Sequence, residues 1–82
     1  MGVYDMALGE ILKSIRKELN ISQEQLARDL NISFSTINRW ENNHTTPSRL
    51  ARMRLVDYCA KKEVSPDTVS AFKHIYFDEE ID

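Results

Sequence analysis

Few residues of this chain have the side chains that catalysis or metal binding needs. Cys59 is the one cysteine and has no partner for an internal disulfide. His44 lacks a second histidine or a carboxylate at metal-ligand spacing, and His74 is expected to be a structural or surface residue. Neither Gly2 nor Gly9 stands in a loop that could cradle phosphate, and no nucleophile–base arrangement is visible. We therefore expect a protein that is not an enzyme and that holds no metal or cofactor.

A binding function is instead indicated by residues 21–43, which contain two short helical stretches separated by about four turn residues. Two helices joined so closely must cross steeply, and the crossing needs a small residue such as Ala27. Aliphatic side chains to fill the crossing are present: Leu26, Leu30, Ile32 and Ile37. The second helix of such a pair can project as a ridge whose width suits the major groove of DNA.

Apolar periodicity and capping residues predict an all-α protein, a compact bundle of about five helices. The first helix spans residues 6–19, with Asp5 as its N-cap and Asn20 as the left-handed residue that ends it. Its apolar stripe comprises Leu8, Ile11, Leu12, Ile15 and Leu19. The spacing of these residues predicts that one face of this helix lies in the core.

The two helices of the motif are expected to begin at serine N-caps. Ser22 and Gln25 have the spacing of a capping box for the second helix, which lasts to about residue 30. Ser33 caps the third helix, which runs to about residue 42. The inner side of this third helix comprises Ile37, Trp40 and Glu41. Trp40 is expected in the core.

Two further helices complete a single predicted domain over residues 1–77. Ser48 caps a fourth helix, 49–61, whose apolar residues are too many for one narrow stripe, so we expect it to be buried broadly. These residues are Leu50, Met53, Leu55, Val56, Tyr58 and Cys59. Ser65 caps a fifth helix, 66–77, that begins with Pro66. Residues 78–82 form an acidic tail that we expect to be disordered.

This pattern closely resembles the phage-repressor and Cro-like helix-turn-helix family, often called the Xre type. The matching residues lie within about residues 8–60: Leu12-x-x-x-Arg16, Ile21-Ser22-Gln23-Glu24-x-Leu26-Ala27, Leu30-x-Ile32-Ser33-x-Ser35-Thr36-Ile37-x-Arg39-Trp40-Glu41 and Pro47-Ser48. Asn31 and Asn43 stand where the family usually has glycine, and asparagine is the commonest substitute in left-handed conformation. The resemblance implies a lambda-repressor-like fold and a cytoplasmic, repressor-like transcription regulator that binds specific sequences of double-stranded DNA.

By this resemblance the third helix is the recognition helix, and its groove-facing residues are Phe34, Ser35, Asn38 and Arg39. Arg39 can donate two hydrogen bonds to guanine, and Asn38 can bridge to adenine. Ser35 can hydrogen-bond a base edge or a phosphate, and Phe34 can press on a thymine methyl group. Two alternatives stay open: Phe34 can fold back into the core, and Arg39 can pair with an acid on the second helix.

The resemblance also implies which residues hold the DNA backbone. Gln23 corresponds to a phosphate contact that is supported by the N-terminus of the second helix. The other backbone-clamping candidates are Thr36, Asn42, Asn43, His44 and Thr45. Arg16 and Glu41 correspond to a largely enclosed ion pair that ties the first helix to the end of the third. We expect this pair to be structural rather than functional.

Charge is unevenly distributed along the chain. The formal net charge of −2 by itself disfavours a nucleic-acid partner. Residues 1–62, however, hold ten of the eleven lysines and arginines and seven of the thirteen acids, whereas residues 63–82 hold six acids against Lys73 alone. The basic excess coincides with the motif, although both regions can also be simply solvated faces. No apolar run is long enough to cross a membrane.

The C-terminal part is expected to serve in assembly. One recognition helix reads only a few base pairs, so a two-fold homodimer is expected. The fifth helix offers an apolar stripe for this contact: Val69, Phe72, Ile75 and Tyr76. Alternatively, this stripe only closes the bundle against the first helix. The competing functional hypothesis is a protein-interaction module, such as an antitoxin-like partner that also binds its operator, with the acidic segment 63–82 as its partner surface.

Overall fold

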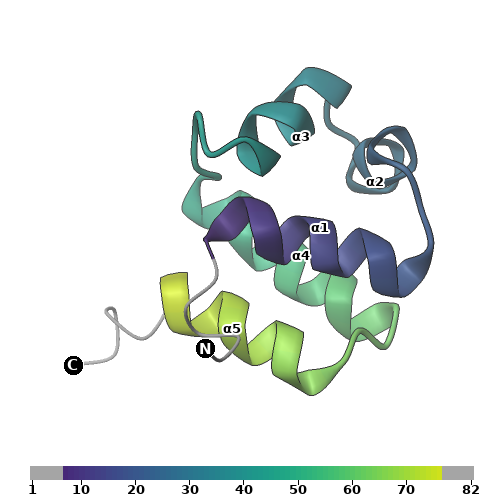
Figure 1. The fold of residues 1–82 in the computed structure, drawn as a ribbon, viewed down its shortest axis with the longest axis vertical. Helices are drawn as coiled ribbons and strands as arrows, with labels where there is room; N and C mark the ends of the chain where they lie inside the picture. Colours follow the sequence, from purple (N-terminus) through teal and green to yellow (C-terminus); the bar gives the residue numbers. More distant parts are fainter. Residues whose placement is uncertain (1–6, 77–82) are drawn as a thin grey trace.

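The computed structural model describes residues 7–76, without the side chains of Ile75 and Tyr76. Over this range the chain forms five helices and no strand: α1 Leu8–Leu19, α2 Gln23–Leu30, α3 Phe34–Glu41, α4 Arg49–Lys61 and α5 Pro66–Tyr76. Figure 1 shows α1 and α4 across the middle of the molecule, α2 and α3 at one end and α5 at the other. The prediction of an all-α bundle is confirmed.

α1 is the central helix because it packs against both α3 and α5. Its side chains Ile11, Leu12 and Ile15 are fully buried. They meet buried residues from each of the other helices: Leu26, Ala27 and Leu30 of α2, Ile37 and Trp40 of α3, Leu55, Tyr58 and Cys59 of α4, and Ala71 and Phe72 of α5. One apolar core therefore holds the two helices of the motif on the same support as the rest of the domain.

The predicted serine caps are present at the starts of α2, α3, α4 and α5, where Ser65 Oγ accepts the backbone N–H of Thr68 at 3.4 Å. Ser22 Oγ accepts the backbone N–H of Gln25 at 3.0 Å, and Ser33 Oγ accepts that of Thr36 at 3.1 Å. Ser48 Oγ accepts from the Ala51 N–H at 3.2 Å. The capping box at Ser22 is only half formed, because the Gln25 side-chain amide donates to Asp29 at 2.7 Å.

Left-handed asparagines end α1 and α2, as predicted for Asn20 and Asn31. Their φ angles are 56° and 58°, and each residue directs its N–H back to the last turn of its helix. Ile32 N–H then donates to the Ala27 carbonyl at 2.9 Å, which completes the turn between α2 and α3. Asn31 thus adopts at this turn the left-handed backbone conformation that glycine adopts most readily.

α1 begins two residues after its predicted start at about residue 6. Ala7 is the N-cap, with an extended backbone at φ −74° and ψ 162°, and no side chain caps the helix there. Asp5 lies outside the described residues. An acceptor comes instead from the loop after α3. Asn43 Oδ1 accepts the backbone N–H of Gly9 at 3.0 Å.

The expectation that α4 is buried broadly is also wrong. Only Leu55, Tyr58 and Cys59 of this helix are buried, while Leu50 and Met53 are 68% and 49% exposed. α4 packs against α2 and α5. These contacts leave the side of α4 that carries Leu50 and Met53 open.

Two of the four residues of the predicted α5 stripe, Val69 and Phe72, pack in the bundle, as the alternative to a dimer interface predicts. Phe72 is 2% exposed and Val69 is partly buried against the core, so these residues close the bundle against α1. A side chain that is already in the core cannot also bind a second copy. The side chains of Ile75 and Tyr76 and the tail 78–82 lie outside the described residues.

The start of α5 is attached to α1 through one carboxylate. Glu18 accepts the backbone N–H of Ser65 at 2.8 Å, the Ser65 hydroxyl at 2.8 Å and the Thr68 hydroxyl at 2.6 Å. These hydrogen bonds, led by that from the Ser65 backbone, lower the pKa of the Glu18 carboxyl. The carboxylate also lies where the partial positive charge of a helix N-terminus favours it.

Among residues 7–76, no helix has the length and apolar composition that a membrane-spanning helix requires.

Candidate nucleic-acid interface

The two sides of α3 differ sharply in exposure. Ile37, Trp40 and Glu41 face inward and are buried. Phe34, Ser35, Asn38 and Arg39 are all exposed, with Phe34 at 49%. The alternative that Phe34 belongs to the core is therefore wrong. Arg39 makes no ion pair with any residue that the structure describes, which argues against the alternative of an acid on α2 as its partner.

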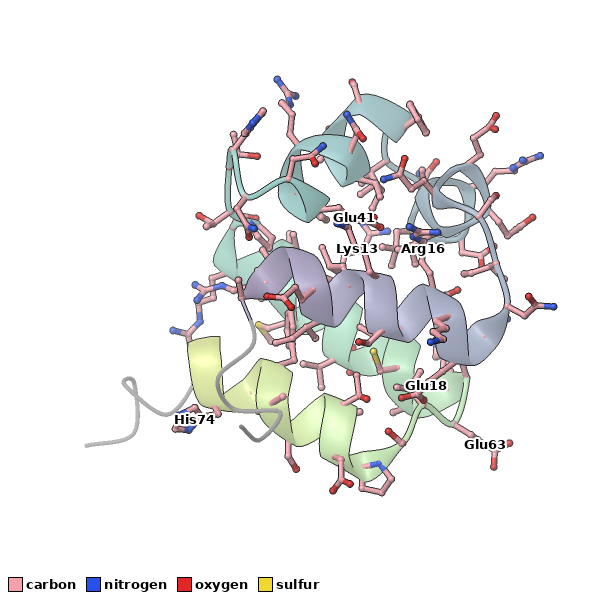
Figure 2. The ribbon with its side chains drawn as sticks, in the orientation of Figure 1. Lys13, Arg16, Glu18, Glu41, Glu63 and His74 are labelled. Carbon is pink, nitrogen blue, oxygen red and sulfur yellow. The ribbon has the colours of Figure 1, made fainter. Side chains whose placement is uncertain are left out.

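Arg16 and Glu41 form a two-pronged ion pair beneath α3 (Figure 2). Arg16 Nε donates to Glu41 Oε2 at 2.6 Å, and its Nη2 donates to Oε1 at 2.8 Å. The hydrogen bond to Glu41 raises the pKa of Arg16, so the guanidinium is charged at any physiological pH. The Glu41 side chain is 1% exposed. The negative charge of the only carboxylate of α3 is therefore paired with Arg16, and it lies away from the exposed side of the helix.

Gln23 lies between this ion pair and the outer face of α3. Its side-chain amide donates to Glu41 Oε1 at 3.0 Å and to Asn38 Oδ1 at 3.4 Å. Asn42 Nδ2 also reaches Asn38 Oδ1, at 3.3 Å, and donates to the Asn38 backbone carbonyl at 2.9 Å. The side-chain oxygen of Asn38, Oδ1, thus already accepts hydrogen bonds in the free protein. The side-chain nitrogen of Asn38 is left to donate to a further partner.

Hydroxyl groups gather at the start of α3. Ser33 Oγ lies 2.8 Å from Thr36 Oγ1 and 3.2 Å from Ser35 Oγ. Both Ser35 and Thr36 were expected to contact DNA, and here they share hydrogen bonds with the N-cap. A hydroxyl group can donate one bond and accept others, so this cluster keeps acceptor or donor capacity for a further partner.

The loop after α3 exposes the four other residues expected to clamp the DNA backbone: Asn42, Asn43, His44 and Thr45. Asn43 adopts a left-handed conformation at φ 59°, as its place in the pattern predicted. Its Oδ1 holds the Gly9 N–H at 3.0 Å, so half of its side chain is used to join α1 to the loop. The His44 N–H donates to the Arg39 carbonyl at 2.9 Å, which fixes the loop to the end of α3.

Residues 12–51 match a protein-family model described as Helix-turn-helix. The matched segment, about half of the chain, is a DNA-binding helix-turn-helix of the phage-repressor, or Xre, type. The match covers the two motif helices, most of α1 and the first residues of α4. Comparisons with curated proteins and with solved structures give no match.

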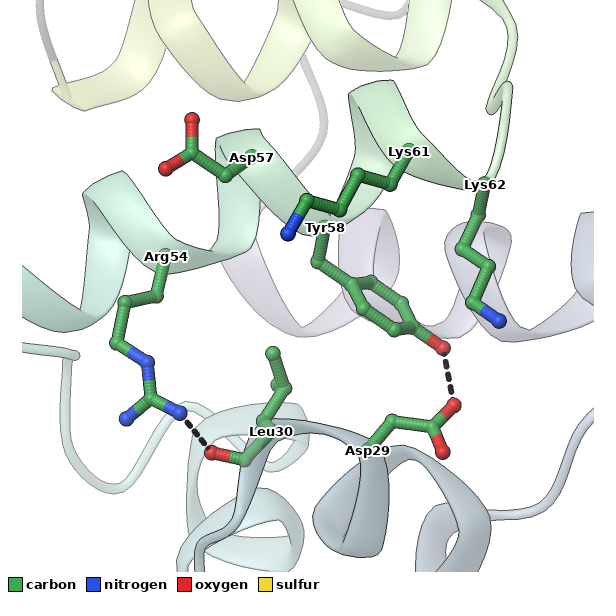
Figure 3. A pocket seen from close by; sticks show the side chains of 7 residues that line it. All are labelled: Asp29, Leu30, Arg54, Asp57, Tyr58, Lys61 and Lys62. Atoms are coloured by element: carbon green, nitrogen blue, oxygen red, sulfur yellow. Dashed lines mark hydrogen bonds between the residues drawn. The ribbon is translucent and has the colours of Figure 1, made fainter.

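Residues outside the family match complete the support of the helix-turn-helix motif. A pocket of about 410 Å³ lies between α2 and α4. Two hydrogen bonds across it join the two helices (Figure 3). Tyr58 donates to Asp29 at 2.7 Å, and Arg54 donates to the Leu30 carbonyl. The Tyr58 hydrogen bond lowers the pKa of Asp29, and burial together with Asp29 raises that of Tyr58. No spacing rule pairs residues 29 and 58, so sequence reasoning missed this contact.

Proposed function

We propose that this helix-turn-helix protein regulates transcription by reading a specific DNA sequence in the major groove with α3. The observation that carries the proposal is the outer ridge of α3. This ridge exposes Phe34, Ser35, Asn38 and Arg39, while the opposite side of the helix is fixed in the core. A rigid helix with exposed polar side chains is what direct readout of base edges needs.

The charges on this helix support the same proposal. Arg39 is exposed, and the one acid of α3 is buried against Arg16. Phosphate oxygens on either side of a groove would therefore meet an arginine and neutral hydrogen-bond donors, with no exposed carboxylate from α3. This local arrangement matters more for DNA binding than the chain's net charge of −2, because interactions between exposed charges more than about 8 Å apart are largely screened at physiological salt.

Within this proposal the polar residues fall into two groups. Arg39, Asn38, Ser35 and Phe34 face the bases, with Arg39 as the group best suited to a guanine. Backbone contacts come from Gln23, Thr36, Asn42, Asn43, His44 and Thr45. Because Asn38 Oδ1 already accepts from Gln23 and Asn42, Asn38 is expected to donate to a single base acceptor unless those two side chains release it.

Selection from a random library of duplex DNA tests the proposal. The purified chain is expected to enrich one sequence pattern and to hold that duplex in an electrophoretic titration against an excess of unrelated competitor. DNA from around its own gene is then tested for the same pattern. Two results would overturn the proposal of sequence-specific reading. Either the unrelated competitor displaces all of the bound duplex, or the selected DNA molecules share no sequence pattern.

A further inference from the structure

The side chain of Asn38, on the exposed side of α3, is held by donors from two directions. Its Oδ1 accepts from Gln23 Nε2 at 3.4 Å and from Asn42 Nδ2 at 3.3 Å. An amide oxygen has two lone pairs, and these donors occupy both of them. Among the residues that the structure describes, none accepts a hydrogen bond from Asn38 Nδ2. The nitrogen is therefore the polar atom of Asn38 that a ligand can use.

A buried carboxylate fixes the orientation of the Gln23 amide. Gln23 Nε2 donates to Glu41 Oε1 at 3.0 Å. A carboxylate that is paired with an arginine can only accept hydrogen bonds, so the atom of Gln23 that faces it must be the nitrogen. Glu41 is in turn held by two hydrogen bonds from Arg16, and its side chain is 1% exposed. The second hydrogen of Gln23 Nε2 is then the one that reaches Asn38.

A backbone carbonyl fixes the orientation of Asn42 in the same way. Asn42 Nδ2 donates to the Asn38 backbone oxygen at 2.9 Å, and a carbonyl oxygen can only accept. The same nitrogen faces Asn38 Oδ1. Both neighbours thus present N–H groups to the Asn38 side chain. If the Asn38 amide were turned over, its NH₂ group would face two other donors, and both hydrogen bonds would be lost.

We infer that Gln23 and Asn42 are positioning residues that make Asn38 a donor-only reader of bases, with guanine preferred over adenine. The inference rests on the proposed function and names the base that one position of α3 selects. In the major groove guanine presents two acceptors, N7 and O6, whereas adenine presents the acceptor N7 beside the N6 donor. Asparagine bridges adenine only if its oxygen can accept from N6. Because the Asn38 oxygen is occupied, the structure favours guanine where the residue type alone predicts adenine.

The same hydrogen bonds determine what the Gln23 side chain can do. Its nitrogen carries two hydrogens, and it uses one on Glu41 and one on Asn38. A phosphate oxygen needs a donor, but the remaining polar atom of the side chain, Oε1, is an acceptor. The phosphate contact expected of Gln23 therefore falls to its backbone N–H, which has no partner within α2 because it lies in the first turn. The side chain acts on Asn38 instead.

The lengths of the two hydrogen bonds determine the size of the expected effect. At 3.3 and 3.4 Å they are longer than an ordinary N–H···O bond, so adenine can displace them at a cost. We expect the wild type to prefer guanine over adenine by about fivefold, the factor that one net hydrogen bond supplies. Cytosine presents only its N4 donor in the groove and gains nothing from Asn38.

The base profile, defined as the set of affinities for all single-base variants of the selected duplex, tests the inference. Asn38→Ala identifies the position that Asn38 reads, because the preference there is lost. Gln23→Met combined with Asn42→Ala frees the Asn38 oxygen, so the preference at this position should reverse to adenine by about fivefold or more. An adenine preference in the wild type, or an unchanged guanine preference in the double variant, would overturn the inference.

Two controls separate positioning from a general effect on fold or affinity. Gln25→Met removes a glutamine of the same helix whose side chain contacts Asp29, and it should leave the base profile unchanged. In the Asn38→Ala background, Gln23→Met with Asn42→Ala can lower the affinity for every sequence but should not alter the base profile, because both side chains act on it through Asn38. A change of base preference in that background would contradict the positioning role.

A measurement without DNA distinguishes a failure of this inference from a failure of the proposed function. In NMR spectra of the free, isotope-labelled chain, the side-chain NH₂ signals of Gln23 and Asn42 should shift in Asn38→Ala, whereas that of Gln25 should not. If the first two signals stay in place, the Asn38 oxygen is not held and the inference is wrong. If they shift but no DNA sequence is selected, the proposed function fails, and the preference for guanine fails with it.

Discussion

Glu41 links the stability of the domain to the surface of α3. It accepts two hydrogen bonds from Arg16 and one from Gln23, and its side chain is almost completely enclosed. Gln23 in turn contacts Asn38 on the outer face. One buried carboxylate therefore fixes α1, α2 and α3 relative to one another, and it does so without presenting negative charge to a ligand of α3.

Replacing Glu41 by alanine is expected to lower the free energy of unfolding by about 3 kcal/mol. This value is the lower end of the range for breaking buried pairs, because Arg16 keeps 22% of its side chain exposed and can be partly rehydrated. Chemical denaturation of the two proteins measures the difference. Glu24→Ala, which removes an exposed acid from α2, serves as the control and should have little effect.

The Arg16–Glu41 ion pair is expected to add less to the free energy of unfolding than the removal of one partner takes away. Replacing both partners, with Arg16→Met and Glu41→Leu together, should recover much of the stability lost in Glu41→Ala because no unpaired charge remains buried. A double variant as unstable as the single one would show that the ion pair, rather than the avoidance of an unpaired charge, stabilises the fold.

Among the elements, the start of α1 and the end of α3 approach each other unusually closely. A Cβ atom on Gly9 would lie 2.1 Å from the Glu41 carbonyl oxygen and 2.8 Å from its carbonyl carbon. Backbone atoms cannot move aside as a flexible side chain would. Glycine at position 9 is therefore required for the packing of α1 against α3 rather than for its own conformation.

Gly9→Ala is expected to destabilise the domain by about 1 to 3 kcal/mol, the usual cost of overpacking. The sign is opposite to that of a typical glycine-to-alanine change inside a helix, which gains about 1 kcal/mol. Urea denaturation tests the sign, with the exposed Lys13→Ala on the same helix as the control. A more stable Gly9→Ala variant would contradict the close approach of α1 and α3.

The joint between α1 and α5 predicts a dependence of stability on pH. The hydrogen bonds from Ser65 and Thr68 hold the pKa of Glu18 below its ordinary value of 4.5. The unfolded chain therefore takes up this proton first, and the contribution of Glu18 is present above about pH 4.5 and lost as the pH falls through the folded value.

Thermal unfolding of the wild type and Glu18→Gln between pH 7 and pH 3 measures this contribution. The wild type should melt higher at neutral pH, and the difference should shrink as the solution is acidified. Glu10→Gln removes a carboxylate from the other end of α1 and provides the comparison without a contact to α5. A difference that stays constant over the whole range would rule out the Glu18 contribution.

Local features of these elements were predictable, and contacts between distant elements were not. The serine caps at Ser22, Ser33 and Ser48 and the left-handed Asn20 and Asn31 follow from backbone preferences that a few neighbouring residues determine. The inward and outward sides of α3 likewise follow from spacing within one helix. The sequence was therefore sufficient for the helices and for the surface that α3 exposes.

The failures share one physical cause. Apolar spacing shows that Phe72 and Leu50 belong to stripes, but it does not show which stripe the rest of the fold covers: Phe72 is buried and Leu50 is exposed. The Asn43 cap on Gly9 and the Tyr58–Asp29 hydrogen bond join residues 34 and 29 positions apart. Such contacts depend on how helices cross, and no pattern within one helix encodes that.

At the scale of the whole molecule, the candidate DNA contacts lie at one end of the fold. They belong to α3, the first residue of α2 and the loop after α3, whereas α4 and α5 hold none of them. The apolar core around α1 joins this end to the rest of the domain. Substitutions at exposed positions of α4 and α5 should therefore leave the DNA preference of α3 unchanged.

The central claim is that α3 reads DNA sequence, and Arg39 tests it most directly. The measurement is the affinity of wild type, Arg39→Ala and Thr45→Ala for the selected duplex and for every single-base variant of it. Arg39→Ala should lose about 1 to 3 kcal/mol on the selected site and become indifferent to the base at one position. Thr45→Ala, in the loop, should weaken binding similarly on all sequences. Indistinguishable profiles for the two variants, or an unchanged preference in Arg39→Ala, would contradict the assignment of α3 as the reading helix.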